Sequence, residues 1–236
     1  NVTAAPVQVE VKVTVRAEDI DLAGERFELA ADGAEERDIY FFDTPALELF
    51  DDGVILRARN VHDDVDDTTV KIRPLSAASV ARSWFKKSGF KCEIDQTSTK
   101  SVESCSYTLE QGEDEIDDAA KGERAIEKLF TSEQEDFLAK YAPSGPVDWS
   151  ELRMLGPVAA SVWKLEPEKL GTKMTVELWT LPNGERVLEV SARAPQEDAD
   201  ELTEDLEAYV SELGLVADPN GTTKTRTVLE YFASAY

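Results

Sequence analysis

The chain has 236 residues, with 49 acidic and 25 basic side chains and a net charge of -24 when its one histidine is neutral. So large an excess of negative charge repels nucleic-acid backbones and anionic membrane surfaces, and no apolar run approaches the roughly 20 residues of a membrane-spanning helix. One histidine and two cysteines also exclude multi-Cys/His zinc modules and iron-sulfur clusters. We therefore expect no nucleic-acid or membrane partner, and any anionic ligand must meet cations that the fold gathers locally.

Most of the predicted elements are strands. The first runs over Val7–Val15, where valines at every second position share one face, and Gln8, Glu10, Lys12 and Thr14 share the other. Further alternating or β-rich runs cover Arg37–Phe42, Val54–Asn60, Thr68–Arg73, Lys91–Thr97, Ser104–Leu109, Val158–Leu165, Lys173–Leu181, Arg186–Ala194 and Thr223–Phe232. Their short spacing predicts a fold built mainly from β-strands.

Helical patterns lie between the strands. Pro195–Leu213 is the clearest, with proline at its start, acids in its first turns, apolar residues at helical spacing and Gly214 as a stop. A second helix is predicted over Ser132–Tyr141, with Ser132 as its cap and Glu135 three residues on. Shorter helices are predicted over Gly122–Phe130, Pro45–Phe50 and Ala77–Lys87, and the acidic stretch Glu113–Asp118 is expected to be a solvated loop.

The segment Pro143–Pro146 is the strongest break between two groups of strands. Each group alone has few strands with which to bury its apolar faces, so we expect a single domain over residues 1–236, with the groups joined near residues 143–146. The sequence begins at Asn1 without an initiator methionine or a signal-like apolar stretch, so we expect an expressed fragment or a processed form.

The polar faces of these strands are rich in cations. They hold Lys12, Arg57, Arg59, Lys71, Arg73, Lys91, Lys164, Lys173 and Arg193, against Glu10, Glu93, Asp95, Glu177 and Glu189. Charged strand faces also occur on the wet side of ordinary half-buried sheets, but a cation excess in so acidic a chain favours a bound polyanion. If the sheet closes on itself with helices outside, these faces line a polar lumen, where carboxylates invite a hard divalent cation.

Several segments in order resemble the CYTH, or triphosphate tunnel metalloenzyme, superfamily. They are Val9–Lys12, similar to half of an ExExK opening, Tyr40–Leu49, similar to YFDTP…L, Gly53–Arg59, similar to LRIR, Thr69–Arg73, similar to TxKxR, and the later runs Lys91–Asp95, Val176–Leu178 and Leu188–Ser191. The resemblance implies an α+β fold, with a closed eight-stranded antiparallel β tunnel, a charged lumen and surrounding helices. It also implies hydrolysis of inorganic tripolyphosphate or an organic triphosphate with Mg²⁺ or Mn²⁺.

The resemblance further implies roles for individual residues. Phosphate oxygens would be held by Lys12, Arg57, Arg59, Lys71, Arg73, Lys164 and Lys224, and the metal by Glu10, Glu177 and Glu189. Two departures weaken the metal cage: Gln8 stands where the first glutamate of ExExK is expected, and Ser191 stands where a second late carboxylate often occurs. Each brings oxygen without charge, so we expect a lower metal affinity.

These observations predict a metal-dependent triphosphatase with Lys12, Glu93 and Asp95 as its catalytic candidates, the two acids by orienting water. Salt bridges from these acids to Lys71 and Arg73 are the structural alternative. Three other functions stay open: a non-catalytic binder of polyphosphate or a phosphometabolite with a degraded metal site, an adenylate cyclase, and an acidic β-domain used for protein contacts.

The two cysteines bear on the cellular compartment. Cys92 and Cys105 flank a predicted hairpin near Ser98–Thr99, where a cross-strand disulfide is feasible. We expect two buried free thiols and a cytoplasmic protein, whereas a disulfide would indicate a secreted or periplasmic one. Trp179 shares the strand face of Glu177 and is expected to pack rather than to stack on a ligand.

Overall fold

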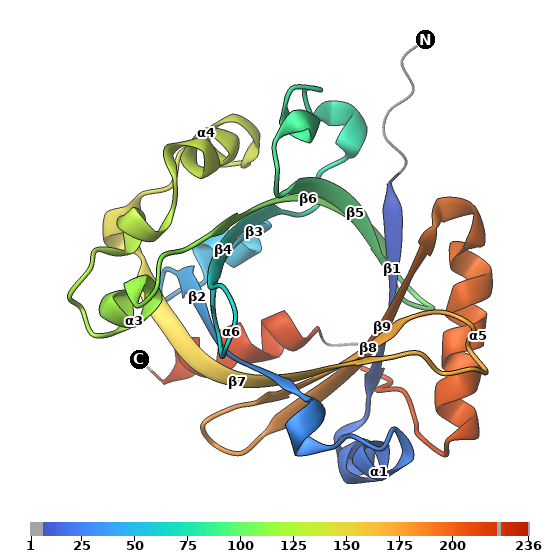
Figure 1. Cartoon of the computed structure of the whole chain (residues 1–236). Coiled ribbons are helices and arrows are strands. Elements are labelled where there is room, and N and C mark those ends of the chain that lie inside the picture. Colours follow the sequence, from blue (N-terminus) through green and yellow to red (C-terminus); the bar gives the residue numbers. More distant parts are fainter. Residues whose placement is uncertain (1–6, 221–222, 236) are drawn as a thin grey trace. The chain divides into compact units, whose positions relative to one another are not determined.

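The computed structural model of the chain describes residues 7–220 and 223–235 (Figure 1). Its strands are β1 (Gln8–Val15), β2 (Glu35–Asp43), β3 (Val54–Val61), β4 (Asp67–Ile72), β5 (Phe90–Gln96), β6 (Ser101–Glu110), β7 (Arg153–Leu165), β8 (Met174–Thr180) and β9 (Arg186–Pro195). Its α-helices are α1 (Ile20–Arg26), α2 (Glu48–Asp51), α3 (Glu115–Ala120), α4 (Ser132–Tyr141), α5 (Ala199–Glu212) and α6 (Lys224–Ser234).

The strands pair in the order β1-β5-β6-β4-β3-β2-β7-β8-β9, and the order closes into a barrel because β9 also pairs with β1. The predicted closed barrel with helices is therefore confirmed, but two details of the prediction are wrong. The described residues form nine strands rather than eight, and β1 runs parallel to β5, so the sheet is mixed. Alternation within a strand does not encode the direction of its partner, which is why the sequence did not reveal the parallel pair.

The described residues divide into two compact units. The first unit lies within Asn1–Glu36, Glu93–Val102 and Val158–Thr227, and the second within Arg37–Cys92, Glu103–Pro157 and Val228–Tyr236. The expected junction at residues 143–146 therefore lies inside the second unit. The expectation of a single domain stays a prediction.

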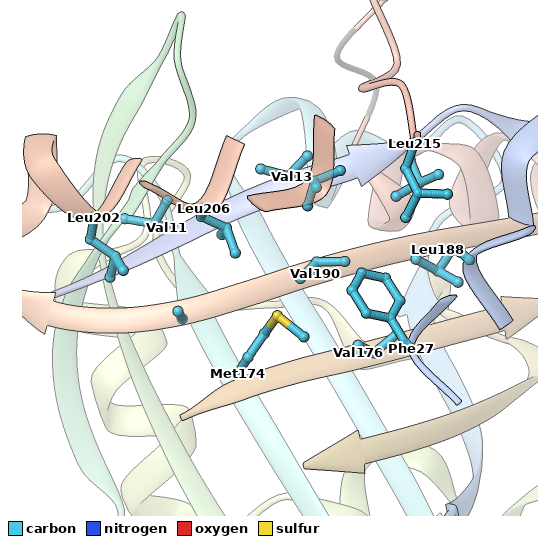
Figure 2. Close-up of a cluster of buried hydrophobic side chains, with 14 of the residues drawn as sticks. Val11, Val13, Phe27, Met174, Val176, Leu188, Val190, Leu202, Leu206 and Leu215 are labelled. Atoms are coloured by element: carbon cyan, nitrogen blue, oxygen red, sulfur yellow. The ribbon is translucent and has the colours of Figure 1, made fainter. Parts of the chain in front are cut away.

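An apolar core in the first unit joins α5 to β1 and β9. Val11 and Val13 of β1 belong to the same buried cluster as Leu202 and Leu206 of α5, and Figure 2 shows these side chains between the helix and the strands. The helix follows a short 3-10 turn at Gln196–Asp198, so the helix predicted over Pro195–Leu213 is confirmed. Because the valines of β1 are buried here, the alternating Glu10 and Lys12 lie on the opposite strand face.

The second unit has its own core. Its strands pair antiparallel in the order β2, β3, β4, β6. Trp84, Phe90, Tyr107 and Phe137 form an aromatic cluster beneath α4, with ring centroids 5.3 to 6.1 Å apart. The edge-to-face contacts of Phe137 with Trp84 and Phe90 hold α4 to this cluster.

The cap of α4 differs by one residue from the prediction. Thr131 rather than Ser132 is the N-cap: its Oγ1 accepts a hydrogen bond from the Gln134 amide at 3.2 Å, and the Gln134 side chain accepts one from the Thr131 amide at 3.0 Å. Thr131 and Gln134 form the same reciprocal capping box that Ser132 and Glu135 would form, so the sequence pattern allowed both registers.

The C-terminal prediction was wrong in kind. Residues Lys224–Ser234 form helix α6 where a strand was predicted over Thr223–Phe232. The threonines and valine of this segment favour a strand by composition. However, Val228, Leu229 and Phe232 are the buried residues, and their spacing is that of one helix face.

Three further helix predictions and one loop prediction differ from the structure. Gly122–Phe130 contains only a 3-10 turn at Ile126–Leu129, whereas the acidic stretch predicted as a loop contributes to α3. Ile116 and Ala119, three residues apart, are buried and hold α3 to the protein despite its acids. The predicted helix Ala77–Lys87 is reduced to 3-10 turns at Ala77–Ser79 and Trp84–Lys86, and Pro45–Phe50 to α2.

The Tyr40–Leu49 segment, which carries part of the family resemblance, is a structural turn. Asp43 is 2% exposed, and its carboxylate accepts hydrogen bonds from the amides of Thr44 at 2.7 Å and of Leu49 and Phe50 at 3.0 Å. Burial raises the pKa of Asp43 even though these three amides act to lower it. Asp43 thus holds the turn that leads from β2 into α2.

Cys92 of β5 and Cys105 of β6 form a disulfide. The expectation of free thiols is wrong, and the cytoplasmic localisation inferred with it loses its support. Over residues 7–220 and 223–235, no helix has the length and apolar character required to cross a bilayer.

Candidate functional site

Three carboxylates from β1 and β5 meet in the first unit. In the parallel pair, Glu10 lies opposite Asp95, and Gln8 lies opposite Glu93. One side-chain oxygen from each of Glu10, Glu93 and Asp95 lies within 4.8 Å of the other two. We call these three residues the carboxylate group. All of its donors are hard oxygens at short mutual distance, so the group fits Mg²⁺ or Mn²⁺ in its chemistry.

Two cations neutralise part of the carboxylate group. Lys12 Nζ lies 2.9 Å from Asp95 Oδ1 and 3.8 Å from Glu10 Oε2. Arg193 Nη2 lies 3.3 Å from Glu10 Oε2 and 3.8 Å from Glu93 Oε2. These contacts place one cation beside each pair of neighbouring acids.

The pKa shifts follow from burial and from these contacts. Burial alone would raise the pKa of Glu10, but the positive charges of Lys12 and Arg193 outweigh it and hold the pKa below its ordinary value. Burial alone would lower the pKa of Lys12, but the carboxylates of Glu189, Glu10 and Asp95 raise it. Both groups therefore stay charged at neutral pH.

A second acidic pair lies on β8 and β9. Glu177 and Glu189 are directly opposite each other, an arrangement that is repulsive for like charges. Lys224, the first residue of α6, bridges them, with Nζ 2.6 Å from Glu177 Oε2 and 2.8 Å from Glu189 Oε1. Burial alone would lower the pKa of Lys224, but the two glutamates raise it. Lys224 is thus the shared counter-ion of these two glutamates.

Trp179 completes the surroundings of Lys224. Its Nε1 donates a hydrogen bond to Glu177 Oε1 at 2.7 Å, and Lys224 Nζ lies 5.0 Å from the centroid of a Trp179 ring. The Trp179 side chain is buried, so the expectation that it packs is confirmed.

No protein-family model matches the chain, and no curated protein sequence matches it. Solved structures do. One is a Hippeastrum protein provisionally assigned as an adenylyl cyclase, which shows a dominant triphosphatase activity; it matches with a TM-score of 0.66 and 14% identity, over 94% of each chain. Another, from Bacillus halodurans and provisionally assigned as an adenylate cyclase, matches with a TM-score of 0.63 and 14% identity, over 95% of this chain and 98% of that one.

Matches over nearly the whole of both chains decide the fold. This chain has the CYTH-type fold. The resemblance found in the sequence is confirmed to that extent, since at 14% identity the similarity concerns the fold.

Four of the other cations predicted from the CYTH resemblance belong to the second unit, and Lys164 belongs to the first. In the second unit, Arg57 Nη2 donates to Thr69 Oγ1 at 3.3 Å, and Arg59 Nε lies 2.9 Å from Asp67 Oδ1 on the neighbouring strand. Lys71 belongs to β4 and Arg73 follows it. Lys164, on β7 in the first unit, is exposed. The phosphate-binding roles of these residues stay predictions.

Sequence reasoning missed how the CYTH-type fold assembles the carboxylate group. Glu10 and Asp95 are far apart in the chain, and the parallel pairing that joins them left no local pattern. Arg193 was recognised as a cation on a strand face but not as a site residue. The signal for it was its place four residues after Glu189, on the same face of β9.

Proposed function

We propose that this protein is a metal-dependent hydrolase of a triphosphate, either inorganic tripolyphosphate or an organic triphosphate. The observation that carries the proposal is the carboxylate group beside the charged ammonium of Lys12. The triphosphatase activity of the Hippeastrum protein, which has the same fold, supports it.

The chemistry of triphosphate hydrolysis suits these residues. Such substrates carry several negative charges, and the transition state spreads charge over phosphoryl oxygens, so catalysis is mainly positioning and neutralisation. A bound Mg²⁺ or Mn²⁺ would neutralise phosphate oxygens and polarise water. Lys12, fixed by Asp95, would bind a phosphate oxygen as a point charge. The phosphate-binding roles predicted for Arg57, Arg59, Lys71, Arg73, Lys164 and Lys224 belong to the same proposal.

The donor spacing also refines the proposed metal ligands. Glu10, Glu93 and Asp95 offer oxygens to a common point, whereas Glu177 and Glu189 are bridged by Lys224. We therefore propose the carboxylate group as the metal-binding set. We prefer this set to Glu177 and Glu189 as metal ligands. We also prefer metal binding to water orientation as the role of Glu93 and Asp95.

The test is phosphate release from tripolyphosphate by the purified protein, with Mg²⁺ or Mn²⁺ and with excess EDTA. We expect release that requires the metal and that Glu10→Gln reduces strongly. The same assay with ATP should form no cyclic AMP; its formation would establish a cyclase instead.

A non-catalytic binder is the second candidate, because Gln8 and Ser191 each bring an uncharged oxygen where the CYTH resemblance expects a carboxylate. It predicts tight tripolyphosphate binding in calorimetry and no phosphate release with either metal. That pair of results would replace the hydrolase proposal.

A further inference from the structure

Arg193 differs from the other two cations of the site in its exposure. Its side chain is 54% exposed, whereas those of Lys12 and Lys224 are 23% and 14% exposed. The carboxylates that it contacts, Glu10 and Glu93, are only 15% and 11% exposed. Arg193 is therefore a solvent-side counter-ion to two largely buried acids.

The strand register fixes this position. Arg193 of β9 lies directly opposite Glu10 of β1, and Glu10 lies opposite Asp95 of β5. The guanidinium therefore reaches Glu10 from one side while β5 supplies Glu93 and Asp95 from the other. Because Arg193 Nη2 is close to both Glu10 and Glu93, its positive charge offsets the repulsion between these two carboxylates.

A divalent cation that binds to the carboxylate group must compete for its oxygens with the side chains of Lys12 and Arg193. Lys12 is not easily displaced, because its Nζ lies 2.9 Å from Asp95 Oδ1 and its charge also interacts with the carboxylates of Glu10 and Glu189. Lys224 is bound to Glu177 and Glu189 instead. Of these three cations, only Arg193 has a largely exposed side chain, so its guanidinium can rotate away from the carboxylates and stay hydrated.

We propose that Arg193 is an exchangeable counter-ion that positions Glu10 and Glu93 before metal binds and is displaced by the divalent cation. The inference rests on the metal site of the proposed function. Arg193 acts through the two carboxylates and is a positioning residue.

The test measures Mn²⁺ binding without substrate, by calorimetry or by the electron paramagnetic resonance signal of free Mn²⁺. Arg193→Gln removes the competing charge, so we expect Mn²⁺ to bind about 3- to 10-fold more tightly than to the wild type. Arg193→Lys keeps the charge and should stay near the wild-type affinity. In EDTA, Arg193→Gln should lower the Tm because Glu10 and Glu93 then repel, and Mn²⁺ should raise its Tm by more than it raises that of the wild type.

Arg186→Gln is the matched control. Arg186 lies on the same strand and the substitution removes the same charge, but its side chain pairs with Asp21 at 2.9 Å. We expect its Mn²⁺ affinity to stay within about 2-fold of the wild type, because Arg186 contacts none of the three carboxylates and solvent and salt screen a more distant charge.

An Mn²⁺ affinity that is unchanged or weaker in Arg193→Gln would overturn the proposal, as would a failure of both wild type and variant to bind Mn²⁺. An equal gain in Arg186→Gln would overturn it too, since the effect would then be one of net charge. The assay needs no turnover, so the two proposals can fail separately. Tighter Mn²⁺ binding without triphosphate hydrolysis would refute only the proposed function.

Discussion

Lys12 is half-buried and Asp43 is buried, and the protein accommodates these two ionisable side chains in different ways. Lys12 is surrounded by the carboxylates of Glu10, Asp95 and Glu189, which raise its pKa against the effect of burial. Asp43 has backbone amides as partners, and burial raises its pKa despite them. Lys12 lies beside the carboxylate group, whereas Asp43 holds a turn of the backbone, although both belong to segments that resemble the same family.

Replacing Asp43 tests the structural role of its motif. In Asp43→Asn, one carboxylate oxygen becomes an amide NH₂, so either the backbone amide of Phe50 or those of Thr44 and Leu49 lose their acceptor. We expect a loss of about 1–3 kcal/mol in the free energy of unfolding, measured by urea denaturation.

Asp51→Asn is the control, because Asp51 is exposed at the end of α2. Its free energy of unfolding should stay within about 0.5 kcal/mol of the wild type. Equal stability of Asp43→Asn and wild type would show that the three amide contacts do not hold the turn.

At the scale of elements, strands were predictable because each buries one face. The valines of β1 alternate strictly, and the predicted run and the observed strand differ by one residue. Helix α6 was not predictable from composition, since Thr227 and Val228 favour strands. The helix is stabilised instead by burial of Val228, Leu229 and Phe232 on one of its faces. Tertiary contacts override such local preferences.

The candidate site was predictable only in its parts. The alternation placed Glu10 and Lys12 on one face of β1, and Glu93 and Asp95 on β5 at i, i+2 spacing. Their meeting depends on the parallel β1–β5 pairing, which is a long-range property with no local signature. The same reason explains why Arg193 could be placed on a strand face but not beside Glu10.

The disulfide between β5 and β6 gives a prediction at this scale. Cys92 and Cys105 close a short loop, so replacing both with alanine frees the unfolded chain and should destabilise the protein by about 2–4 kcal/mol. A thiol reductant should lower the Tm of the wild type and leave that of the double variant unchanged. An equal wild-type Tm with and without the reductant would argue against the disulfide.

At the scale of the whole molecule, the charge is the dominant property. With 49 acidic and 25 basic residues, a compact chain repels itself, and the local groups around Lys12 and Lys224 relieve only a small part of this. Screening by salt should therefore favour the folded state more than in a neutral protein.

We expect the Tm to rise with potassium chloride between 0.1 and 1 M, where the screening length falls from about 10 to about 3 Å. A rise of roughly 3 °C would correspond to about 1 kcal/mol for a chain of this size. Differential scanning fluorimetry at constant pH measures it, and potassium chloride avoids the general stabilising effect of sulfate. A Tm that stays constant or falls would mean that charge repulsion is not a significant term.

In the proposed function, the charged face of the first unit, with Lys12 beside the carboxylate group, turns over a triphosphate. The most direct measurement is kcat/KM for tripolyphosphate with Mn²⁺ in wild type, Lys12→Met and the exposed-site control Lys100→Met, each confirmed as folded by circular dichroism. We expect metal-dependent hydrolysis by the wild type, a loss of at least about 100-fold in Lys12→Met and a change of less than about 2-fold in Lys100→Met. A folded Lys12→Met protein with wild-type kcat/KM would contradict it.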